Sequence, residues 1–310
     1  MTQRSGEWFR ELAAEIEREP EPAVDAAGAG VSNAMTVDVE DYFIVTNFEK
    51  VIQRSQWPSF EPTVQYATDR VLDLFARAGV RATFFVLGWV AERWPQVVRA
   101  IDAGGHEIAS HGYWHRRVFE HPPEQFREDV RRAKAVLEDI VGRPVLGHRA
   151  PTFSIDHHSL WALDILLEEG YEYDSSLYPG RIYRPGFAEG FRQPHNIDRG
   201  DHGLIKEIPM TSLRVGGSRL PFAGGGFFRL YPYPLIRWGM RYINRVDEVP
   251  VIVYFHPWEF APEQPRVRNA PLFGRFKHYV NLRSFPGKIE RLLKDFRFKT
   301  CRELLEEYRL

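Results

Sequence analysis

The chain has 310 residues, of which 41 are Lys or Arg and 42 are Asp or Glu, so its formal net charge is −1. This balance lacks the basic excess typical of nucleic-acid-binding proteins and gives no reason to expect an anionic membrane as the main partner. The single cysteine, Cys301, excludes an intrachain disulfide framework and a cysteine-rich zinc site. The length is sufficient for one large domain or two small ones with a real core.

The first 34 residues are predicted to form a flexible N-terminal extension. A short helix is expected over residues 7–19, followed by a linker that contains Pro20 and Pro22. The longest nearly apolar stretch, residues 82–91, is much shorter than the roughly 20 residues that span a bilayer. Because the amino terminus also lacks the apolar region of a signal peptide, we expect a cytoplasmic protein.

From Met35 onwards, strand-like and helix-like runs alternate along the chain. The expected strands cover residues 36–39, 82–87, 107–110, 145–148 and 251–255. The expected helices between them cover residues 62–78, 95–103, 123–140 and 159–169. This alternation predicts an α/β fold with a parallel sheet, either open or closed into a (β/α) barrel.

The carboxyl-terminal half departs from this pattern. Gly and Pro are dense over residues 180–250, which we interpret as a loop-rich insertion packed on the barrel. Closing helices are expected over residues 286–310, within 287–296 and 302–308. Residues 35–310 are therefore predicted to be a single domain.

Polar residues stand at five candidate strand ends, and active sites of parallel α/β folds lie at such ends. These ends cover residues 38–41, 110–115, 148–151, 173–176 and 255–259. His111 and His115 are four residues apart, and a helical turn after the strand would put both imidazoles on one face. Together with a carboxylate from another strand end, they predict a catalytic site with two histidines and one acid around a divalent ion.

The acidic residues after the first strand can have different roles. On an extended backbone Asp38 and Glu40 point to the same side and Asp41 to the other. One carboxylate could bind the ion while another takes a proton from water. The alternative for Asp41, or for Asp38, is that it only caps the segment that follows.

Three further residues complete the predicted chemistry. Arg149 would keep a neighbouring base carboxylate ionised and correctly directed. Asp174 and His256 could form a carboxylate–imidazole pair that donates a proton to a leaving amine. A surface arginine and a structural buried histidine are the alternatives.

These motifs, in this order, resemble the NodB-homology polysaccharide deacetylases, which form carbohydrate esterase family 4. The similarity covers about residues 35–260 and is carried by His111-x-x-x-His115, Arg149-Ala150-Pro151, Asp174-Ser175-Ser176 and His256. It implies a distorted (β/α) barrel and the metal-dependent removal of N-acetyl groups from amino sugars. The family usually has adjacent Asp-Asp at the first strand end, whereas Val39 separates Asp38 from Glu40 here.

The resemblance implies a role for each matching residue. Asp38 would be the base, positioned by Arg149, and His256 would be the acid, aligned by Asp174. The backbone N–H of Thr152 would stabilise the oxyanion. The ion would be held by His111, His115 and either Glu40, which we favour, or Asp41. The residues expected to border the sugar cleft, or alternatively to pack in the core, are Trp114, Pro151, Tyr178, Arg229 and Trp258.

The segments 36–43, 224–229 and 256–259 with 264–266 resemble a narrower subgroup of deacetylases from exopolysaccharide and exosortase (PEP-CTERM) loci. This implies a role in exopolysaccharide biosynthesis and admits association with membrane-bound polysaccharide-synthesis machinery. The expected cofactor is one divalent ion, zinc or alternatively cobalt or nickel, and the expected partner is an N-acetylated glycan.

Three other functions stay open at this point. The same machinery could hydrolyse a formamido sugar or a cyclic ureide. The fold could serve as a glycan-binding module without turnover, although intact Asp38, His111, His115 and His256 argue against it. The chain could also be an interaction protein that uses residues 1–34 as a tether.

Overall fold

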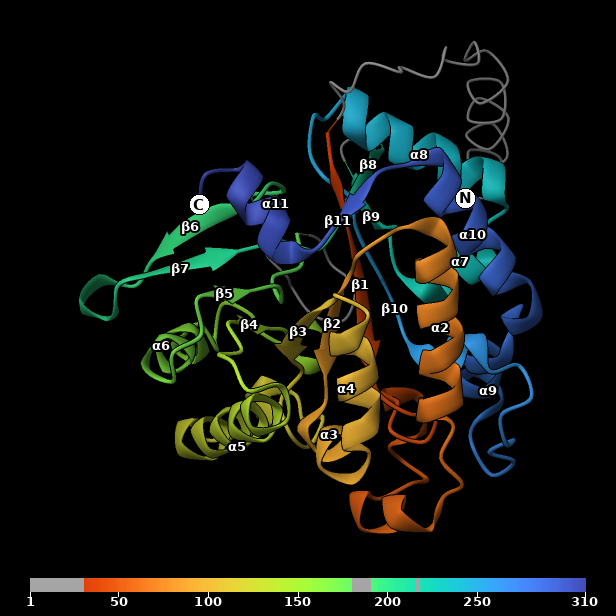
Figure 1. Cartoon of the computed structure of the whole chain (residues 1–310), viewed down its shortest axis with the longest axis horizontal. Helices are drawn as coiled ribbons and strands as arrows, with labels where there is room; N and C mark the ends of the chain where they lie inside the picture. The colour runs from red at the N-terminus through yellow and green to blue at the C-terminus, as the bar shows by residue number, and fades with distance from the viewer. Residues whose placement is uncertain (1–30, 180–190, 216–217) are drawn as a thin grey trace.

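The computed structural model describes residues 31–179, 191–215 and 218–310. The predicted helix over residues 7–19 and most of the predicted N-terminal extension lie outside these ranges. Among the described residues, strands and helices alternate as expected for an α/β fold (Figure 1). None of the helices in the described ranges combines the length and apolarity needed to cross a membrane.

The sheet of the described residues is curled and mostly parallel, and it forms a half-barrel. Its strand order is β10-β1-β2-β3-β4-β5-β7-β6, with β11 paired to the start of β1. Only the β6–β7 pair within it is antiparallel, and this hairpin projects from one end of the sheet, at the left of Figure 1. The strands are β1 (Asn33–Val39), β2 (Thr83–Val86), β3 (Glu107–Ser110), β4 (Gly147–His148), β5 (Tyr173–Asp174), β6 (His195–Asp198), β7 (Leu204–Glu207), β10 (Ile252–Phe255) and β11 (Phe298–Lys299), with β8 (Ser212–Val215) and β9 (Ser218–Pro221) as a separate antiparallel pair.

β1 is an interior strand of the sheet, next to β10 at one end of the strand order. Every residue of β1 is buried, because the strand pairs with β10 on one side and with β11 and then β2 on the other. A strand covered on both faces needs a nearly continuous apolar run, and Val37 and Val39 pack in the main core accordingly. The carboxyl ends of β1, β2, β3 and β10 therefore meet at one edge of the sheet.

The helices cover the sheet with apolar faces of helical period. In α5, for example, Phe126, Val130, Ala133 and Leu137 are all buried, as their spacing predicts. The helices are α2 (Val64–Ala78), α3 (Gly88–Arg93), α4 (Pro95–Ala103), α5 (Pro123–Val141), α6 (Trp161–Glu168), α7 (Gly225–Leu230), α8 (Tyr233–Arg245), α9 (Leu272–Tyr279), α10 (Phe285–Asp295) and α11 (Cys301–Glu307).

The interpretation of residues 180–250 as loop-rich is wrong for much of that segment. It contains the β6–β7 hairpin, the β8–β9 pair and two helices, of which α8 is 13 residues long. The Tyr231–Pro234 run does not mark a loop, because Pro234 lies in the first turn of α8, where a missing N–H has no cost. Residues 180–190 lie outside the described ranges.

Candidate active site

A cavity of about 120 Å³ lies at the carboxyl edge of the sheet. Its walls come from the segments that follow β1, β3, β4 and β10, together with η1 (Thr46–Phe48). Segments more than 200 residues apart in the chain therefore meet here. The lining residues are Asp38, Glu40, Val45, Thr46, Asn47, His111, His115, Thr152, Phe153, Tyr254, His256 and Trp258.

Asp38 is held by a fully buried arginine. Nη1 of Arg149 donates to Asp38 Oδ1 at 2.8 Å and to the Thr36 hydroxyl at 2.8 Å. The rest of the guanidinium is fixed by Ser175, through its carbonyl at 3.2 Å and its hydroxyl at 3.0 Å. Since all these partners are buried, the arginine fixes the direction of the Asp38 carboxylate.

Glu40 lies between two imidazoles. Its Oε2 is 2.9 Å from His115 Nε2, and its Oε1 is 3.5 Å from His256 Nε2. Burial alone raises the pKa of Glu40, but His115 and His256 outweigh this effect and lower the pKa below its ordinary value. The Glu40 side chain is thus ionised in the site.

Asp41 points away from the cavity, to the start of α2. Its two oxygens accept from the backbone N–H groups of Tyr42, Thr63 and Val64 and from the Thr63 hydroxyl, at 2.6 to 2.9 Å. These contacts satisfy N–H groups that a helix start leaves unpaired. The capping alternative therefore describes Asp41, and the option of Asp41 as a metal ligand has no support in this geometry.

His111 and His115 approach each other without a helix. The segment after β3 is a loop, and the two ring centroids are 5.5 Å apart. Asp129 fixes this loop by accepting from the Tyr113 N–H at 2.6 Å. Gly112, with φ 70°, is required here, because a Cβ at this position would meet Asp129 Oδ2 at 2.9 Å. The helical turn expected from the spacing is wrong, although the rings do converge.

The protonation state of His111 follows from its partner. Its Nδ1 lies 2.8 Å from the Arg149 carbonyl oxygen. Because a carbonyl only accepts, Nδ1 carries the proton and Nε2 keeps its lone pair. Burial and the neighbouring His115 lower the pKa of His111 well below its ordinary value, so the ring is neutral.

The carboxylate partner of His256 is Glu259 and not Asp174. Nδ1 of His256 donates to Glu259 Oε1 at 3.0 Å, and Arg229 Nε donates to Glu259 Oε2 at 2.6 Å. Burial alone would lower the pKa of His256, but Glu40 and Glu259 outweigh it and raise the pKa to about 9. Asp174 instead accepts from His148 Nδ1 at 2.8 Å in a fully buried pair.

Asp174 still supports the site from behind. It accepts from the Ser176 hydroxyl at 2.8 Å, whose oxygen in turn accepts from the Ala150 N–H at 2.7 Å. This chain of contacts fixes the segment that carries Arg149 and Thr152. Asp174 is therefore a positioning residue for the loop, and the predicted contact with His256 does not exist.

Of the five residues expected to border the sugar cleft, Trp258 lines the cavity. Thr152, with φ 55°, also lines it, and its expected role was to supply the N–H that stabilises the oxyanion. Trp258 stacks on His256 with ring centroids 5.2 Å apart. The other four, which do not line this cavity, are Trp114, Pro151, Tyr178 and Arg229. Arg229 is buried behind Glu259 and also donates to two backbone carbonyls, so its role is to hold that glutamate.

Sequence reasoning missed Glu259 as part of the site. Its signal was present, because a residue three positions after His256 returns to the same side in a helical turn, here η6 (Pro257–Phe260). The adjacent Gly225 is a second sign, since a Cβ there would meet Glu259 Oε1 at 2.2 Å. The Gly224–Gly226 run thus allows α7 to approach the buried glutamate.

The donor types around the cavity suit a divalent cation. Two imidazoles and one carboxylate are present, and Glu40 Oε2 accepts no well-formed hydrogen bond among the described residues. However, the described residues contain no group of three or more His, Cys, Asp or Glu side chains with the arrangement of a metal site. Glu40 and His115 instead touch each other directly.

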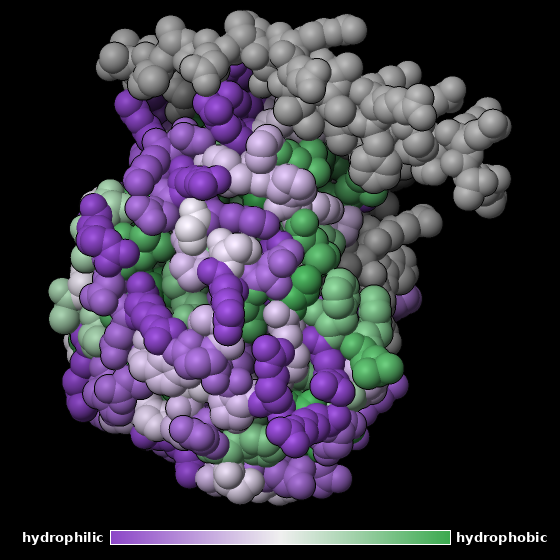
Figure 2. All heavy atoms as spheres, turned by 90° about the vertical axis from the view of Figure 1, so that its right-hand side faces the viewer, coloured by the Kyte–Doolittle hydropathy of each residue, from purple (hydrophilic) through white to green (hydrophobic). Residues whose placement is uncertain are grey.

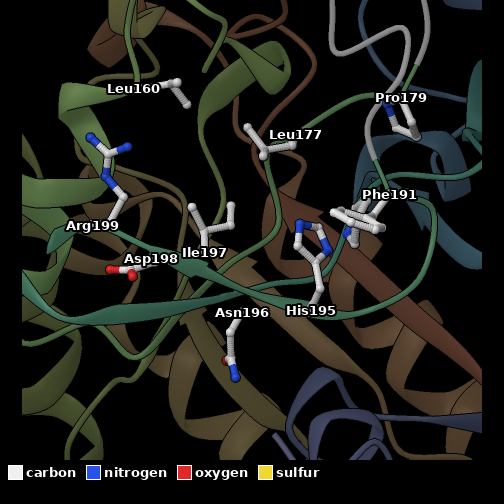
Figure 3. A pocket seen from close by; sticks show the side chains of 10 residues that line it. Leu160, Leu177, Pro179, Phe191, His195, Asn196, Ile197, Asp198 and Arg199 are labelled. Carbon is white, nitrogen blue, oxygen red and sulfur yellow. The ribbon is translucent and has the colours of Figure 1, made fainter.

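A second cavity, of about 360 Å³, lies apart from this site (Figure 3). It is lined mainly by apolar side chains between α6 and β6, and the rings of Phe191 and His195 lie together at its wall. Its Arg199 is paired with Asp164 at 2.6 Å. None of the residues predicted to be functional lines it.

Two family models match the chain. Residues 50–172 match the model described as polysaccharide deacetylase, and residues 175–306 match a domain of unknown function, DUF3473. Among curated proteins, a peptidoglycan-N-acetylglucosamine deacetylase of Bacillus cereus is 31% identical over 171 residues, which are 49% of this chain and 60% of that protein. A peptidoglycan deacetylase-like protein of Gibberella zeae is 33% identical over 110 residues, 35% of this chain and 32% of that protein.

Solved structures agree with the fold. A protein of Mycobacterium smegmatis assigned as a polysaccharide deacetylase has a TM-score of 0.60 at 22% identity, over 94% of both chains.

The chain matches only part of the curated relatives. Its aligned segments span about a third of the Gibberella zeae protein and about three fifths of the Bacillus cereus protein.

Proposed function

We infer that this chain, whose assignment to the NodB-homology polysaccharide deacetylases is supported by the family model and the relatives, is a hydrolase that removes N-acetyl groups from an amino-sugar glycan. The observation that carries the proposal is the convergence of Asp38, Glu40, two histidines and His256 on one cavity. These groups arrive from three different strands, and random surface polarity does not produce such a cluster. The relatives' printed activities on N-acetylated glycans support the substrate class.

Asp38 is the general base of the proposed reaction. Its Oδ1 accepts from Arg149 Nη1 at 2.8 Å, which leaves Oδ2 to accept a proton from the attacking water. Thr152 also lines the cavity, and its backbone N–H is the proposed donor to the negative oxygen of the tetrahedral intermediate.

His256 is the general acid. Its Nδ1 is fixed by Glu259, so Nε2 faces the cavity and can protonate the departing amine. Glu259 is itself held by Arg229, and this buried pair restrains the imidazole from behind. Acetate and a free amino sugar are the products.

A divalent cation, zinc or alternatively cobalt or nickel, is proposed to be held by His111, His115 and Glu40. When bound, it would act as a Lewis acid on the acetamide carbonyl and on water. The neutral His111 ring, with its Nε2 lone pair, and the buried Glu40 carboxylate have the required chemistry. Binding requires the direct contact between Glu40 and His115 to be exchanged for contacts with the ion.

We also propose a role in exopolysaccharide biosynthesis. Its support is the resemblance of three segments, 36–43, 224–229 and 256–259, to deacetylases of such loci. In this structure two of these segments form one unit, because Gly225, Arg229 and Glu259 are in direct contact. The contact between segments 224–229 and 256–259 therefore gives a physical reason for the two to occur together in one chain.

The test is elemental analysis of protein purified without added metal, followed by product analysis on N-acetylated oligosaccharides. We expect about one divalent ion per chain and release of acetate. Formate from a formamido sugar, or ring-opened product from a cyclic ureide, would assign a different amide substrate. Bound metal without any product would instead support a glycan-binding relative without turnover.

A further inference from the structure

Helix α9 presents its apolar side chains to solvent and a polar one to the core. Leu272, Phe273 and Phe276 are 80%, 73% and 57% exposed, whereas His278 is fully buried. The spacing of the three apolar residues puts them on one face of the helix. Other exposed large apolar side chains of the described residues are single residues on separate elements. This face is therefore an apolar patch without a partner in the described part of the chain.

The patch lies in a strongly basic segment. Between Gln264 and Ile289 the chain has six Lys or Arg and no Asp or Glu, although its overall net charge is −1. Arg266, Arg268 and Arg283 are exposed, and Lys277 places its ammonium 5.7 Å from the Phe273 ring. The nearest preceding acid, Glu263, is already paired with Arg70 at 2.5 Å. The positive charge near the patch is thus not neutralised within the segment.

A cavity of about 250 Å³ is lined by residues 265–269, which precede the helix. Arg266 and Arg268 are among its lining residues, together with apolar side chains such as Phe60. The Arg266 guanidinium is held over the Tyr279 ring at 4.1 Å. Two arginines at a partly apolar cavity fit an anionic group carried on an apolar molecule.

We propose that α9 and the basic segment around it, residues 265–283, dock on an anionic lipid bilayer surface. Leu272, Phe273 and Phe276 would enter the headgroup–acyl boundary, while the arginines contact lipid phosphates. Phe and Leu have no hydrogen-bonding group, so they suit hydrocarbon better than the hydroxyl-rich surface of a sugar. The charge of the whole chain does not predict this surface, because the basic residues are concentrated in one segment.

The proposed docking surface is adjacent to the active-site rim. The inner face of α9 packs on η1, with the His278 and Phe48 rings 4.7 Å apart. Thr46 and Asn47 of the same η1 line the catalytic cavity. Figure 2 faces the side of the molecule that carries α9, where hydrophobic surface lies among hydrophilic side chains. Docking would therefore bring the cavity close to the bilayer surface.

The test is co-sedimentation of the full chain with vesicles, and it does not depend on catalytic activity. The vesicles contain phosphatidylcholine and phosphatidylglycerol in about a 2:1 ratio, or phosphatidylcholine alone. We expect binding to the anionic vesicles that weakens as salt is added. The double variant Phe273→Ser/Phe276→Ser should bind at least about tenfold more weakly. The variants Arg266→Gln and Arg268→Gln should each lower the affinity for anionic vesicles about fivefold, and they should not change binding to phosphatidylcholine alone.

The matched control is Leu204→Ser on β7, an equally exposed apolar residue on another face, which should bind like the wild type. Circular dichroism and thermal unfolding establish that each variant is folded, and Leu272→Ser serves as a milder second variant. Failure of the wild type to sediment with anionic vesicles, or wild-type binding by the folded double variant, would overturn the proposal. A lipid-free dimer that the double variant abolishes would assign the surface to a second copy and also overturn it.

Discussion

Replacing Glu259 by Gln tests whether this glutamate aligns His256, the proposed general acid. Glu259 Oε1 accepts from His256 Nδ1 at 3.0 Å and from its backbone N–H at 3.1 Å, and Oε2 accepts from Arg229 Nε at 2.6 Å. Gln has the same shape but only one oxygen. If that oxygen faces His256, the new NH₂ opposes the buried guanidinium of Arg229. If it faces Arg229, the NH₂ opposes both donors of His256.

The size of the effect follows from these contacts. A hydrogen bond to a charged group contributes about 1.5–3 kcal/mol, so kcat should fall by about 10- to 100-fold if the imidazole loses its alignment. KM should change little, because Glu259 does not line the cavity. The variant should also lose about 3 kcal/mol of stability, since a buried charge loses its partner. Adding Arg229→Met removes that unpaired charge and should restore stability without restoring kcat.

The assay is acetate release from N-acetylated chito-oligosaccharides, with thermal unfolding and metal content measured on the same preparations. Glu263→Gln, an exposed glutamate on the same segment, is the matched control and should retain wild-type kcat. Asp174→Asn is the informative comparison, because it removes the partner that sequence alone suggested for His256. A folded Glu259→Gln variant with wild-type kcat, or a larger kcat loss in a folded Asp174→Asn variant, would refute the reasoning.

Three further outcomes are expected. Asp38→Asn should lower kcat at least about 100-fold with the fold unchanged, and a near wild-type rate would remove Asp38 as the base. Gly225→Ala should mimic Glu259→Gln, because its Cβ would meet Glu259 Oε1 at 2.2 Å; wild-type kcat and thermal stability in this variant would show that the contact relaxes freely. His106 is buried, accepts the Ala82 N–H at Nδ1, and has its pKa lowered by burial from 6.5 to about 4. Protonation of His106 therefore favours the unfolded chain. Its contribution to the free energy of unfolding is intact above pH 6.5, and about 3 kcal/mol of that free energy is lost as the pH falls to 4. Denaturant unfolding at pH 7 and pH 4.5 should show a smaller difference for His106→Gln than for the wild type, and an equal difference would contradict the assignment.

Sequence patterns predicted the elements of the first half well. Helix α4 and strand β3 begin and end where expected, and α5 differs by one residue, because these segments have a clear period and clear stops. The second half was harder to predict. Helix α8 begins in a run of Tyr and Pro that is typical of loops, and short strands such as β5 have only two residues to show a pattern.

The site was predictable in its members but not in its contacts. Strand parity correctly separated Asp38 and Glu40 from Asp41, since side chains alternate along an extended backbone. The partner of His256 could not be derived in the same way. Asp174 ends β5 and Glu259 follows β10, so both were candidates from their positions in the sequence. Tertiary packing decides between them, because Arg229 and Gly225 allow the glutamate to reach the imidazole.

The boundary between the two matched family models, at residues 172–175, does not divide the molecule physically. The region matched by the second model returns through β10 and β11 to flank β1. This strand precedes both matched regions and pairs with strands of each, because β2 of the first region is also its neighbour. A fragment limited to the first region would lack Asp38, Glu40 and His256, the proposed base, carboxylate ligand and acid. Conversely, a chimaera that exchanges only the later portion with a relative would replace the proposed acid while the loop with His111 and His115 stays native. The region matched by the second model thus supplies His256 and Glu259 to the proposed catalytic site.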